Sequence, residues 1–379
     1  MIRIAMVAGE ASGDMLAAHL IEALKTHLPD ACFFGIGGQK MESAGFEAWW
    51  PHEKLAVRGY AEVLRHYREI TGIRRQLLAR LLKDKPDVFI AVDAPDFNLW
   101  LEARLKKQGI PTIHYVSPSI WAWRGGRIKK IGKAVSHVLA LFPFEAPLYE
   151  KRHIPVSYVG HPLADLTPME SLRQVARERL ALSQTVKVFA LLPGSRQSEL
   201  KFMAELFVDT AKKLHERFPE AIFLAPFISR ETRTQFEIAL WKLEAQELPI
   251  RLLFGHARDA LAACDVALVA SGTATLEAAL LKAPMVITYR MSPWSWWLMK
   301  RMRYQPWVGL PNILANFGFV PEFLQEAATS DALAQTLGDL AVDEPTRSGM
   351  IRMFETLHEQ LRQGTAKKAA AAILPYLKS

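Results

Sequence analysis

The sequence predicts an α/β protein with two doubly wound parallel sheets that face a cleft. Short runs rich in Val, Ile and Phe alternate with longer amphipathic segments, which is typical of parallel strands covered by helices. The 379 residues also fit two domains, since an ordinary domain holds about 100–200 residues. We expect domains at 1–165 and 166–345, followed by C-terminal helices at 346–379 that lie outside the second sheet.

Two series of expected strands follow each other along the chain, separated by a polar helical stretch that ends at residue 182. In the first series the strands are 2–7, 32–36, 88–92, 112–116, 138–142 and 156–159, and the helices include 15–26, 70–82 and 99–107. In the second series the strands are 186–192, 221–225, 250–254, 266–269 and 285–289, with helices that begin near residues 199, 230, 257 and 275.

The composition is typical of a globular cytoplasmic protein. Half of the residues are hydrophobic and 23% are charged, and no stretch has the length and apolarity of a membrane-spanning helix. The N-terminus has no basic segment before a hydrophobic one, so we expect no export signal. The two cysteines, Cys32 and Cys264, lie in apolar runs and are expected to be reduced and buried. A metal cluster of the CxxC kind is excluded.

Ligands of doubly wound sheets bind at the carboxyl ends of the strands, so the loops that follow strands are the candidate sites. The first such loop, GEASGD at 9–14, lacks the spacing of dinucleotide-binding and P-loop motifs. Glu10 would place a carboxylate in the cleft. Ser12, Gly13 and Asp14 fit either a ligand contact or an ordinary loop in which Ser12 or Asp14 caps the next helix.

Two aspartates follow the expected strand at 88–92. Pro95 cannot continue a central strand, which leaves Asp93 at the carboxyl edge of the sheet. A carboxylate there can act as a general base for a proton within hydrogen-bond reach. We interpret Asp96 as a turn or helix-capping residue.

The second domain has two loops suited to a diphosphate. LPGSR at 192–196 precedes a helix, so backbone N–H groups and the Arg196 guanidinium can bind an anion, although an arginine on a surface loop is common. SGTAT at 271–275 repeats the arrangement. Glu277 either interacts with the helix dipole or accepts hydrogen bonds from ribose hydroxyls. The donor-site candidates are Gly194, Ser195, Arg196, Ser271, Gly272, Thr273, Thr275 and Glu277.

Seven motifs resemble, in their order, those of the lipid-A-disaccharide synthase family, and the match runs from residue 7 past residue 312. They are VAGEASGD at 7–14, GIGG at 35–38, DAPDFN at 93–98, HYVSPSIWAWR at 114–124, LPGSR at 192–196, SGTATLE at 271–277 and LPN at 310–312. The resemblance implies a GT-B fold of two Rossmann-like domains. It also implies C-terminal helices that cross back to the first domain or swap between the protomers of a homodimer.

The activity implied by the resemblance is that of an inverting glycosyltransferase. Its donor would be UDP-2,3-diacylglucosamine and its acceptor 2,3-diacylglucosamine 1-phosphate, known as lipid X. The products would be the β-1,6-linked lipid A disaccharide 1-phosphate and UDP. The resemblance further implies no metal, no cofactor and peripheral attachment to the cytoplasmic face of the inner membrane.

The candidate residues supply a mechanism compatible with that reaction. Asp93 would deprotonate the acceptor 6-hydroxyl, which attacks the anomeric carbon from the face opposite UDP. Arg196 would stabilise the departing diphosphate, and Glu277 would hold the ribose. Asn312 matches the functional asparagine of the family's LPN motif, and the alternative is a turn residue after Pro311. The acceptor-side candidates are Glu10, Ser12 and Gly13.

Two other functions remain open on the residues alone. One is a transferase or epimerase acting on another UDP-sugar, which would share the diphosphate loops but not the whole motif set. The other is a lipid- or nucleotide-binding protein without catalytic activity, which would bind UDP without releasing it from a donor. For His19 and His114 a place in the site stays open, and we interpret them as structural residues.

The net charge of +8, from 47 basic and 39 acidic residues, is concentrated locally. No acidic residue lies between Glu102 and Glu145, where eight basic ones occur: Arg104, Lys106, Lys107, Arg124, Arg127, Lys129, Lys130 and Lys133. A second segment places Trp294, Trp296, Trp297 and Trp307 beside Lys300, Arg301 and Arg303. Such segments fit an anionic membrane surface, as does the amphipathic stretch 55–73, for which a core-facing helix is the alternative. Nucleic acid is disfavoured because no recognised binding motif is present.

Overall fold

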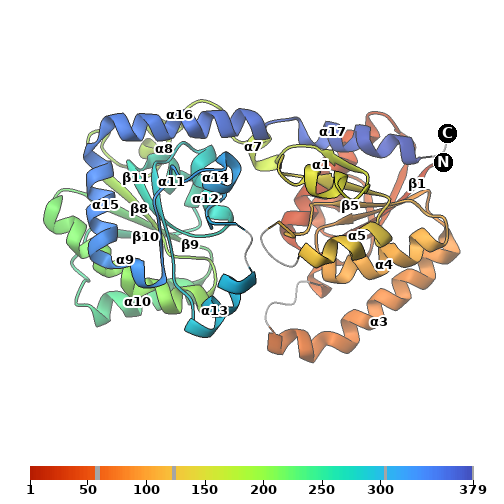
Figure 1. Cartoon of the computed structure of the whole chain (residues 1–379), viewed down its shortest axis with the longest axis horizontal. Helices are drawn as coiled ribbons and strands as arrows, with labels where there is room; N and C mark the ends of the chain where they lie inside the picture. Colours follow the sequence, from red (N-terminus) through yellow and green to blue (C-terminus); the bar gives the residue numbers. More distant parts are fainter. Residues whose placement is uncertain (56–59, 122–124, 303–304, 378–379) are drawn as a thin grey trace. The chain divides into compact units, whose positions relative to one another are not determined.

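The computed structural model describes residues 1–55, 60–121, 125–302 and 305–377. The chain divides into two compact units, Met1–Asp165 with Leu361–Ser379, and Leu166–Gln360, which we call unit 1 and unit 2. Each unit has a parallel sheet with helices on both faces, which confirms the predicted fold class (Figure 1). The predicted membrane-facing residues Val57, Arg58, Arg124 and Arg303 lie outside the described residues, as do the side chains of residues 60–67.

Unit 1 contains a seven-stranded sheet in the order β3-β2-β1-β4-β5-β6-β7. Its strands are β1 Arg3–Ala8, β2 Cys32–Gly37, β3 Phe46–Pro51, β4 Val88–Val92, β5 Thr112–Tyr115, β6 His137–Ala140 and β7 Val156–Tyr158. The order reverses between β1 and β4, which pair in parallel. Such a switch point opens a crevice outside the carboxyl ends of the two strands, where ligands bind.

Helices cover both faces of this sheet. Along β4, Ile90 and Val92 pack toward α1 and α17, whereas Phe89 and Ala91 pack toward α3 and α4. This alternation explains why β4 is apolar at every position. The helices of unit 1 are α1 Ala11–Lys25, α2 Gln39–Ser43, α3 Tyr60–Asp84, α4 Pro95–Lys107, α5 Ile128–Ala134, α6 Ala146–Glu150 and α17 Thr365–Ile373, and α7 Pro162–Leu166 spans the boundary to unit 2.

Unit 2 contains a six-stranded sheet in the order β10-β9-β8-β11-β12-β13, with its switch point between β8 and β11. Its strands are β8 Val188–Leu192, β9 Ile222–Phe227, β10 Ile250–Phe254, β11 Val266–Ala270, β12 Met285–Tyr289 and β13 Glu322–Leu324. Helices α9, α10 and α15 pack together, and α8, α11, α12 and α14 form a second group. The helices are α8 Arg173–Arg179, α9 Gln197–Arg217, α10 Arg230–Lys242, α11 Ala257–Ala263, α12 Thr273–Leu280, α13 Pro293–Met302, α14 Leu310–Ala315, α15 Ser330–Val342 and α16 Glu344–Leu361.

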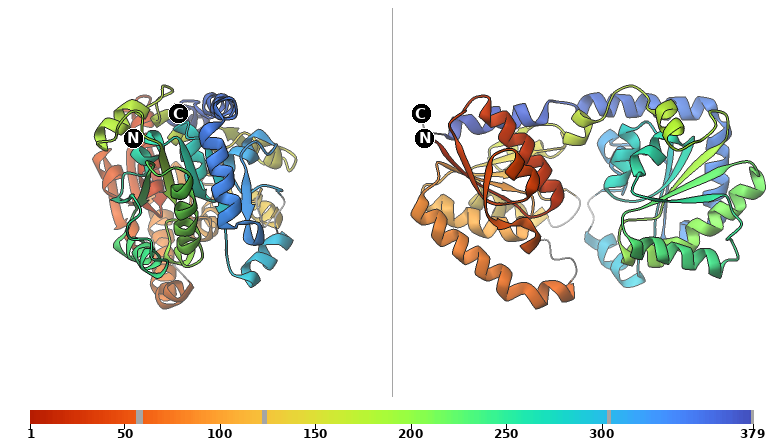
Figure 2. Two further views of the ribbon diagram at one scale, coloured as in Figure 1. Left: turned by 90° about the vertical axis from the view of Figure 1, so that its left-hand side faces the viewer. Right: turned by 180° about the vertical axis from the view of Figure 1, so that it is seen from behind.

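The C-terminal helices are divided between the units. Helix α16 packs within unit 2, where Phe354 is fully buried in the core. Helix α17 packs against α1 of unit 1 (Figure 2). It contributes Ala369, Ala370 and Ile373 to the core on that face of the sheet. The predicted return of the C-terminal segment to the first domain is thus made by α17.

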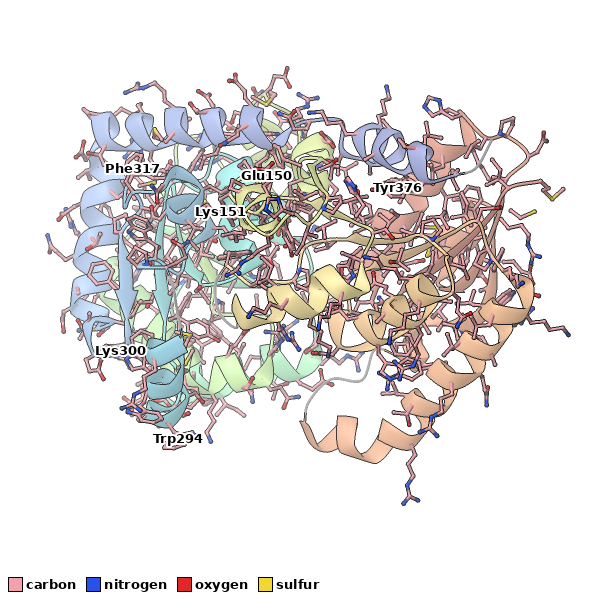
Figure 3. All side chains as sticks on the ribbon, turned by 45° about the vertical axis from the view of Figure 1, so that its right-hand side comes forward. Glu150, Lys151, Trp294, Lys300, Phe317 and Tyr376 are labelled. Carbon is pink, nitrogen blue, oxygen red and sulfur yellow. The ribbon has the colours of Figure 1, made fainter. Side chains whose placement is uncertain are left out.

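Two contacts tie this last segment to unit 1. The Asp165 carboxylate accepts hydrogen bonds from the backbone N–H groups of Gly364, at 2.9 Å, and Thr365, at 2.6 Å, and so caps the N-terminus of α17. The Tyr376 hydroxyl lies 3.1 Å from Nδ1 of His137 on β6 (Figure 3).

Three details differ from the sequence-based expectations. Helix α1 begins at Ala11 rather than near residue 15, because the loop after β1 is only two residues long. Strands β3 and β13 lie at sheet edges and were not expected from the apolar pattern. Cys32 is exposed, with its sulfur 3.1 Å from that of Met1, so the expectation of a buried thiol was wrong there. Cys264 is buried as expected.

Candidate active site

The GEASGD and DAPDFN motifs meet at the switch point of unit 1. Strands β1 and β4 are neighbours, so the loops that begin at Gly9 and Asp93 lie side by side. A Cβ atom on Gly9 would lie 2.9 Å from the Cβ of Ala94, closer than such atoms approach. Glycine at position 9 therefore allows the two loops to touch.

The backbone around Asp93 adopts rarely populated conformations. Asp93 and Ala94 have φ angles of 55° and 46°, and Val116, after the neighbouring strand β5, has φ 78°. Such conformations cost about 1–3 kcal/mol each for residues other than glycine, and they concentrate at functional sites. Ala94 and Val116 carried no sequence signal of this strain, since neither residue type favours positive φ, whereas aspartate is found there more often.

A cavity of about 310 Å³ opens beside these strained residues. Its lining includes Asp93, Asp96, Ser117 and Arg127. Arg127 forms an ion pair with Asp96, so the cavity carries a guanidinium on one side. Among the described residues, the carboxylate of Asp93 makes no hydrogen bond. It is therefore available to a ligand.

The GEASGD residues have different surroundings from one another. Glu10 precedes α1 and is exposed, as is Ser12, whereas Gly13 is buried. A Cβ on Gly13 would lie 3.6 Å from the Cβ of Ala8, an ordinary van der Waals distance, so packing alone does not require glycine there. The Asp14 carboxylate accepts hydrogen bonds from the backbone N–H groups of Gly38, Lys40 and Met41. The shortest, from Gly38, measures 2.8 Å. Asp14 thus caps α2 and holds the GIGG loop.

The LPGSR loop follows β8 at the switch point of unit 2. Gly194 has φ 126°, and Arg196 is the N-cap residue of α9 with a side chain 76% exposed. The Glu199 carboxylate accepts hydrogen bonds from the backbone N–H groups of Ser195, at 2.9 Å, and Arg196, at 3.2 Å. It also lies 3.2 Å from the Arg196 guanidinium. In this structure the amides predicted to bind a diphosphate therefore donate their hydrogen bonds to the Glu199 carboxylate.

Glu199 is a site residue that the sequence-based prediction missed. It lies three residues after the N-cap, which is the spacing of a capping box. That spacing could have identified it, because a glutamate at this position commonly bonds back to the N-cap amide.

The SGTATLE residues link two loops at the adjacent strand end. The Ser271 hydroxyl donates to the carbonyl oxygen of Val308 at 3.1 Å, and the Thr275 hydroxyl accepts from the amide of Leu310 at 3.2 Å. Gly272, with φ 138°, and Thr273 remain exposed at the N-terminus of α12. Among the described residues, the backbone N–H groups of these two have no hydrogen-bond acceptor.

Asn312 is almost fully buried, and its amide is fully engaged within unit 2. Its Nδ2 donates to the carbonyl oxygen of Val320 and to the carboxylate of Glu322, each at 2.8 Å. Its Oδ1 accepts from the amides of Phe319 and Val320. The Glu322 carboxylate in turn accepts hydrogen bonds from the backbone amides of Val308 and Gly309. In this structure Asn312 supports the loop beside SGTATLE.

Glu277 lies half-buried on α12. Burial raises the pKa of its carboxyl group, although the nearby Arg258 acts in the opposite direction. A carboxylate with restricted access to water is suited to bind hydroxyl groups, which compensate for its lost hydration.

The predicted residues thus fall into two groups, one at the switch point of each unit. Gly9 to Gly13, Asp93 and the cavity belong to unit 1, and the LPGSR and SGTATLE loops with Asn312 belong to unit 2. The sequence profile of the lipid-A-disaccharide synthetase family matches residues 4–374. The chain belongs to this family. The lipid-A-disaccharide synthase of Dechloromonas aromatica is 62% identical to it over 377 residues, covering 99% of both chains. That of Azoarcus sp. is 59% identical over 377 residues, covering 100% of this chain and 96% of its own.

Membership of the lipid-A-disaccharide synthase family establishes the activity as that of a glycosyltransferase of lipid A biosynthesis. The family implies lipid X and UDP-diacylglucosamine as substrates. Solved structures agree on the fold. HepE of Anabaena, in complex with UDP and glucose, superposes with a TM-score of 0.61 at 15% identity and covers 99% of both chains. MurG of Acinetobacter baumannii gives 0.58 at 13% identity, covering 99% of this chain and all of its own. The fold is therefore GT-B-like.

The surface segments predicted to face a membrane are partly described. No helix within the described ranges combines the length and apolarity needed to cross a bilayer. On α13, Trp294 and Trp297 are stacked at 5.1 Å and are 71% and 44% exposed, and Arg301 lies 4.0 Å over the Trp297 ring. Figure 3 shows Trp294 and Lys300 on this helix.

Proposed function

We propose that unit 1 binds lipid X and that Asp93 is the general base of the transfer. The observation that carries this proposal is the position of Asp93, a carboxylate without a hydrogen-bond partner among the described residues, at the edge of the cavity. Arg127 in the same lining would attract the acceptor's 1-phosphate, because a guanidinium binds phosphate through two parallel hydrogen bonds. Glu10 and Ser12, which are exposed at the neighbouring strand end, would contact the acceptor.

The donor, UDP-2,3-diacylglucosamine, would bind unit 2. Arg196 and the backbone N–H groups of Gly272 and Thr273 would receive the diphosphate, and Glu277 the ribose. Glu199 would leave the Ser195 and Arg196 amides when the diphosphate arrives, since two anions cannot share these donors. Asn312 would keep the adjoining loop in place through its contacts with Glu322.

The chemical step then needs no group outside the protein and its substrates. The acceptor 6-hydroxyl gives its proton to Asp93 while its oxygen bonds to the anomeric carbon. The bond from that carbon to the UDP oxygen breaks, the configuration inverts from α to β, and UDP leaves with the bonding electrons. Arg196 stabilises the negative charge that develops on the diphosphate.

The test is the rate of UDP release with both lipid substrates at saturation. Asp93→Asn keeps the size of the side chain and tolerates the positive φ, so it removes only the base. We expect its kcat to fall about 100- to 10,000-fold with UDP binding retained. Asp30→Asn, at an exposed aspartate of unit 1 outside the cavity lining, is the matched control and should stay within a few-fold of the wild type. A near-normal rate for Asp93→Asn would exclude Asp93 as the base.

We propose, in addition, that the enzyme reaches its lipid substrates at an anionic membrane surface. The exposed tryptophans and the Arg301 and Lys300 side chains of α13 support this. The acid-free stretch also presents basic side chains on the neighbouring helices α4 and α5. The exposed ones are Arg104, Lys107, Lys129, Lys130 and Lys133. Lys106 does not belong to this surface, because it is half-buried against the C-terminus of α5, and burial lowers its pKa.

A further inference from the structure

A fully buried ion pair lies between β5 and α4 in unit 1. His114 of β5 and Glu102 of α4 have no exposed side-chain surface, and Nδ1 of His114 lies 2.9 and 3.1 Å from the two carboxylate oxygens of Glu102. On this face of the sheet the neighbouring side chains are apolar and include Phe89 and Ala91 of β4 and Leu101 of α4. The pair is therefore a buried ionisable contact inside a largely apolar layer.

Stability does not explain this pair. Removing two ions from water costs several kcal/mol for each, and well-packed apolar side chains of similar volume usually stabilise a core as well or better. Nε2 of His114 also has no hydrogen-bond partner among the described residues, although it is buried. An unpaired buried polar atom costs about 1–3 kcal/mol. A buried ionisable pair with such a cost is a candidate for a functional role.

The pair lies directly behind Asp93. In the register of the parallel strands His114 is opposite Ala91, two residues before Asp93, and the amide of Asp93 donates to the carbonyl oxygen of Tyr115 at 2.9 Å. Asn98, one turn before Glu102 on α4 and also fully buried, donates to the carbonyl oxygen of Asp93 at 2.8 Å. The two elements that hold the ion pair thus also hold the strained backbone of Asp93.

The charges around His114 favour its protonated form. Burial alone would lower the pKa of His114, but the carboxylates of Glu102 and Asp93 raise it, and the net change is upward. On β6 its register neighbour is the apolar Val138. Lys106, the cation farther along α4, is directed at backbone carbonyls of Gly132 and Val135 instead. His114 is therefore in contact with the Glu102 carboxylate and within electrostatic range of the Asp93 carboxylate.

We propose that His114, held by Glu102, is a positioning residue for Asp93. Its imidazolium attracts the Asp93 carboxylate and fixes its orientation toward the arriving acceptor hydroxyl. His114 keeps its own proton throughout, so the proton from the acceptor goes to Asp93 alone. This inference rests on the proposed role of Asp93 as base.

The test compares kcat and KM in the wild type, His114→Asn and Glu102→Gln. Asparagine can still donate a hydrogen bond to Glu102 but cannot carry a charge. We expect kcat about 10- to 100-fold lower with KM for the UDP-sugar unchanged, because the base is no longer held in its productive position. Thr112→Val is the matched control, since Thr112 is buried two residues earlier on the same strand and face. It should lower the melting temperature without changing kcat.

Two results would overturn the inference while leaving the proposed function intact. One is an unchanged kcat in a folded His114→Asn variant when Asp93→Asn is inactive. The other, which does not depend on that variant folding, comes from NMR titration of histidine-labelled protein, with the His114 resonance identified by its shift in Glu102→Gln. We expect His114 to lose its proton at lower pH in Asp93→Asn than in the wild type, and identical titrations would exclude the coupling. An active Asp93→Asn enzyme would instead overturn the proposed function.

Discussion

At the scale of single residues, the unusual feature is the run of left-handed backbone at Asp93 and Ala94. The aspartate is held from both sides, by the Asn98 side chain and by the carbonyl oxygen of Tyr115. The strain is therefore supported by hydrogen bonds from two elements. Ala94 is the residue at which it can be relieved without altering a charged group.

We predict that Ala94→Gly separates stability from activity. Glycine adopts φ 46° without strain, and relief of about 1–3 kcal/mol of strain exceeds the cost of about 0.5–1 kcal/mol from its freedom in the unfolded chain, so the free energy of unfolding should not fall. Turnover should fall, because the loop that carries Asp93 becomes more mobile. The control is Ala103→Gly on the same helix, which should cost about 1 kcal/mol and leave turnover unchanged. Chemical denaturation and UDP release measure both. Equal loss of stability in the two variants would show that Ala94 is not strained.

Asn312 and Glu199 show why a motif residue and its role can differ. The LPN motif led to Asn312 as a functional residue, yet all of its amide atoms bond to the surrounding loop or to Glu322. Those partners lie seven to ten positions away in sequence, in a segment without a recognisable pattern. Glu199 was missed for the opposite reason, because its capping spacing is an ordinary feature of helices.

At the scale of elements, α13 differs from the other helices in what it exposes. Its two stacked tryptophans lie beside cationic side chains, a combination that suits the interface of an anionic bilayer. On α10, by contrast, Trp241 is 72% exposed and has no stacked aromatic partner among the described residues.

We predict that α13 contributes to membrane binding. Replacing Trp294 and Trp297 by alanine and Lys300 and Arg301 by glutamate should reduce flotation with vesicles containing anionic phospholipid at low salt, because each cation near such a surface contributes about 1 kcal/mol. Trp241→Ala should have no effect. Equal flotation of the α13 variant and the wild type would show that α13 does not contribute to membrane binding.

The strands were predicted more accurately than the starts of the helices. Strands such as β4, β8 and β11 were found within two residues because a buried parallel strand is apolar at every position. Helices α1, α4 and α9 begin two to four residues earlier than expected, since their first turns hold the polar motif residues that suggested loops. The position of the motifs at the carboxyl ends of β1, β4, β8 and β11 could be predicted from the alternation of strands and helices. The hydrogen-bond partners of the motif residues could not.

At the scale of the whole molecule, unit 1 is assembled from two separate parts of the chain. The second part is attached through the Asp165 carboxylate, which caps α17, and through the apolar face of α17 on α1. Because few residues make these contacts, we expect one substitution to weaken the attachment of α17 to the rest of unit 1.

We predict that Asp165→Ala loosens α17. Loss of the two hydrogen bonds to its first amides should cost about 1–2 kcal/mol and increase amide hydrogen exchange in α17 and α1. Asp343→Ala, which removes the equivalent contact with Thr346 at the start of α16, should leave exchange in α17 unchanged. Exchange followed by mass spectrometry reports each helix separately. Unaltered exchange in α17 of Asp165→Ala would mean that its apolar face alone holds it.

The discontinuity of unit 1 also sets an order of events during synthesis. The ribosome completes all of unit 2 before it makes α17. While these roughly 195 residues are translated, the side of α1 that later contacts α17 remains uncovered. Incomplete apolar surfaces of this kind are where chains associate wrongly or recruit chaperones. Unit 2, made from one uninterrupted stretch, can fold first even though it is translated second.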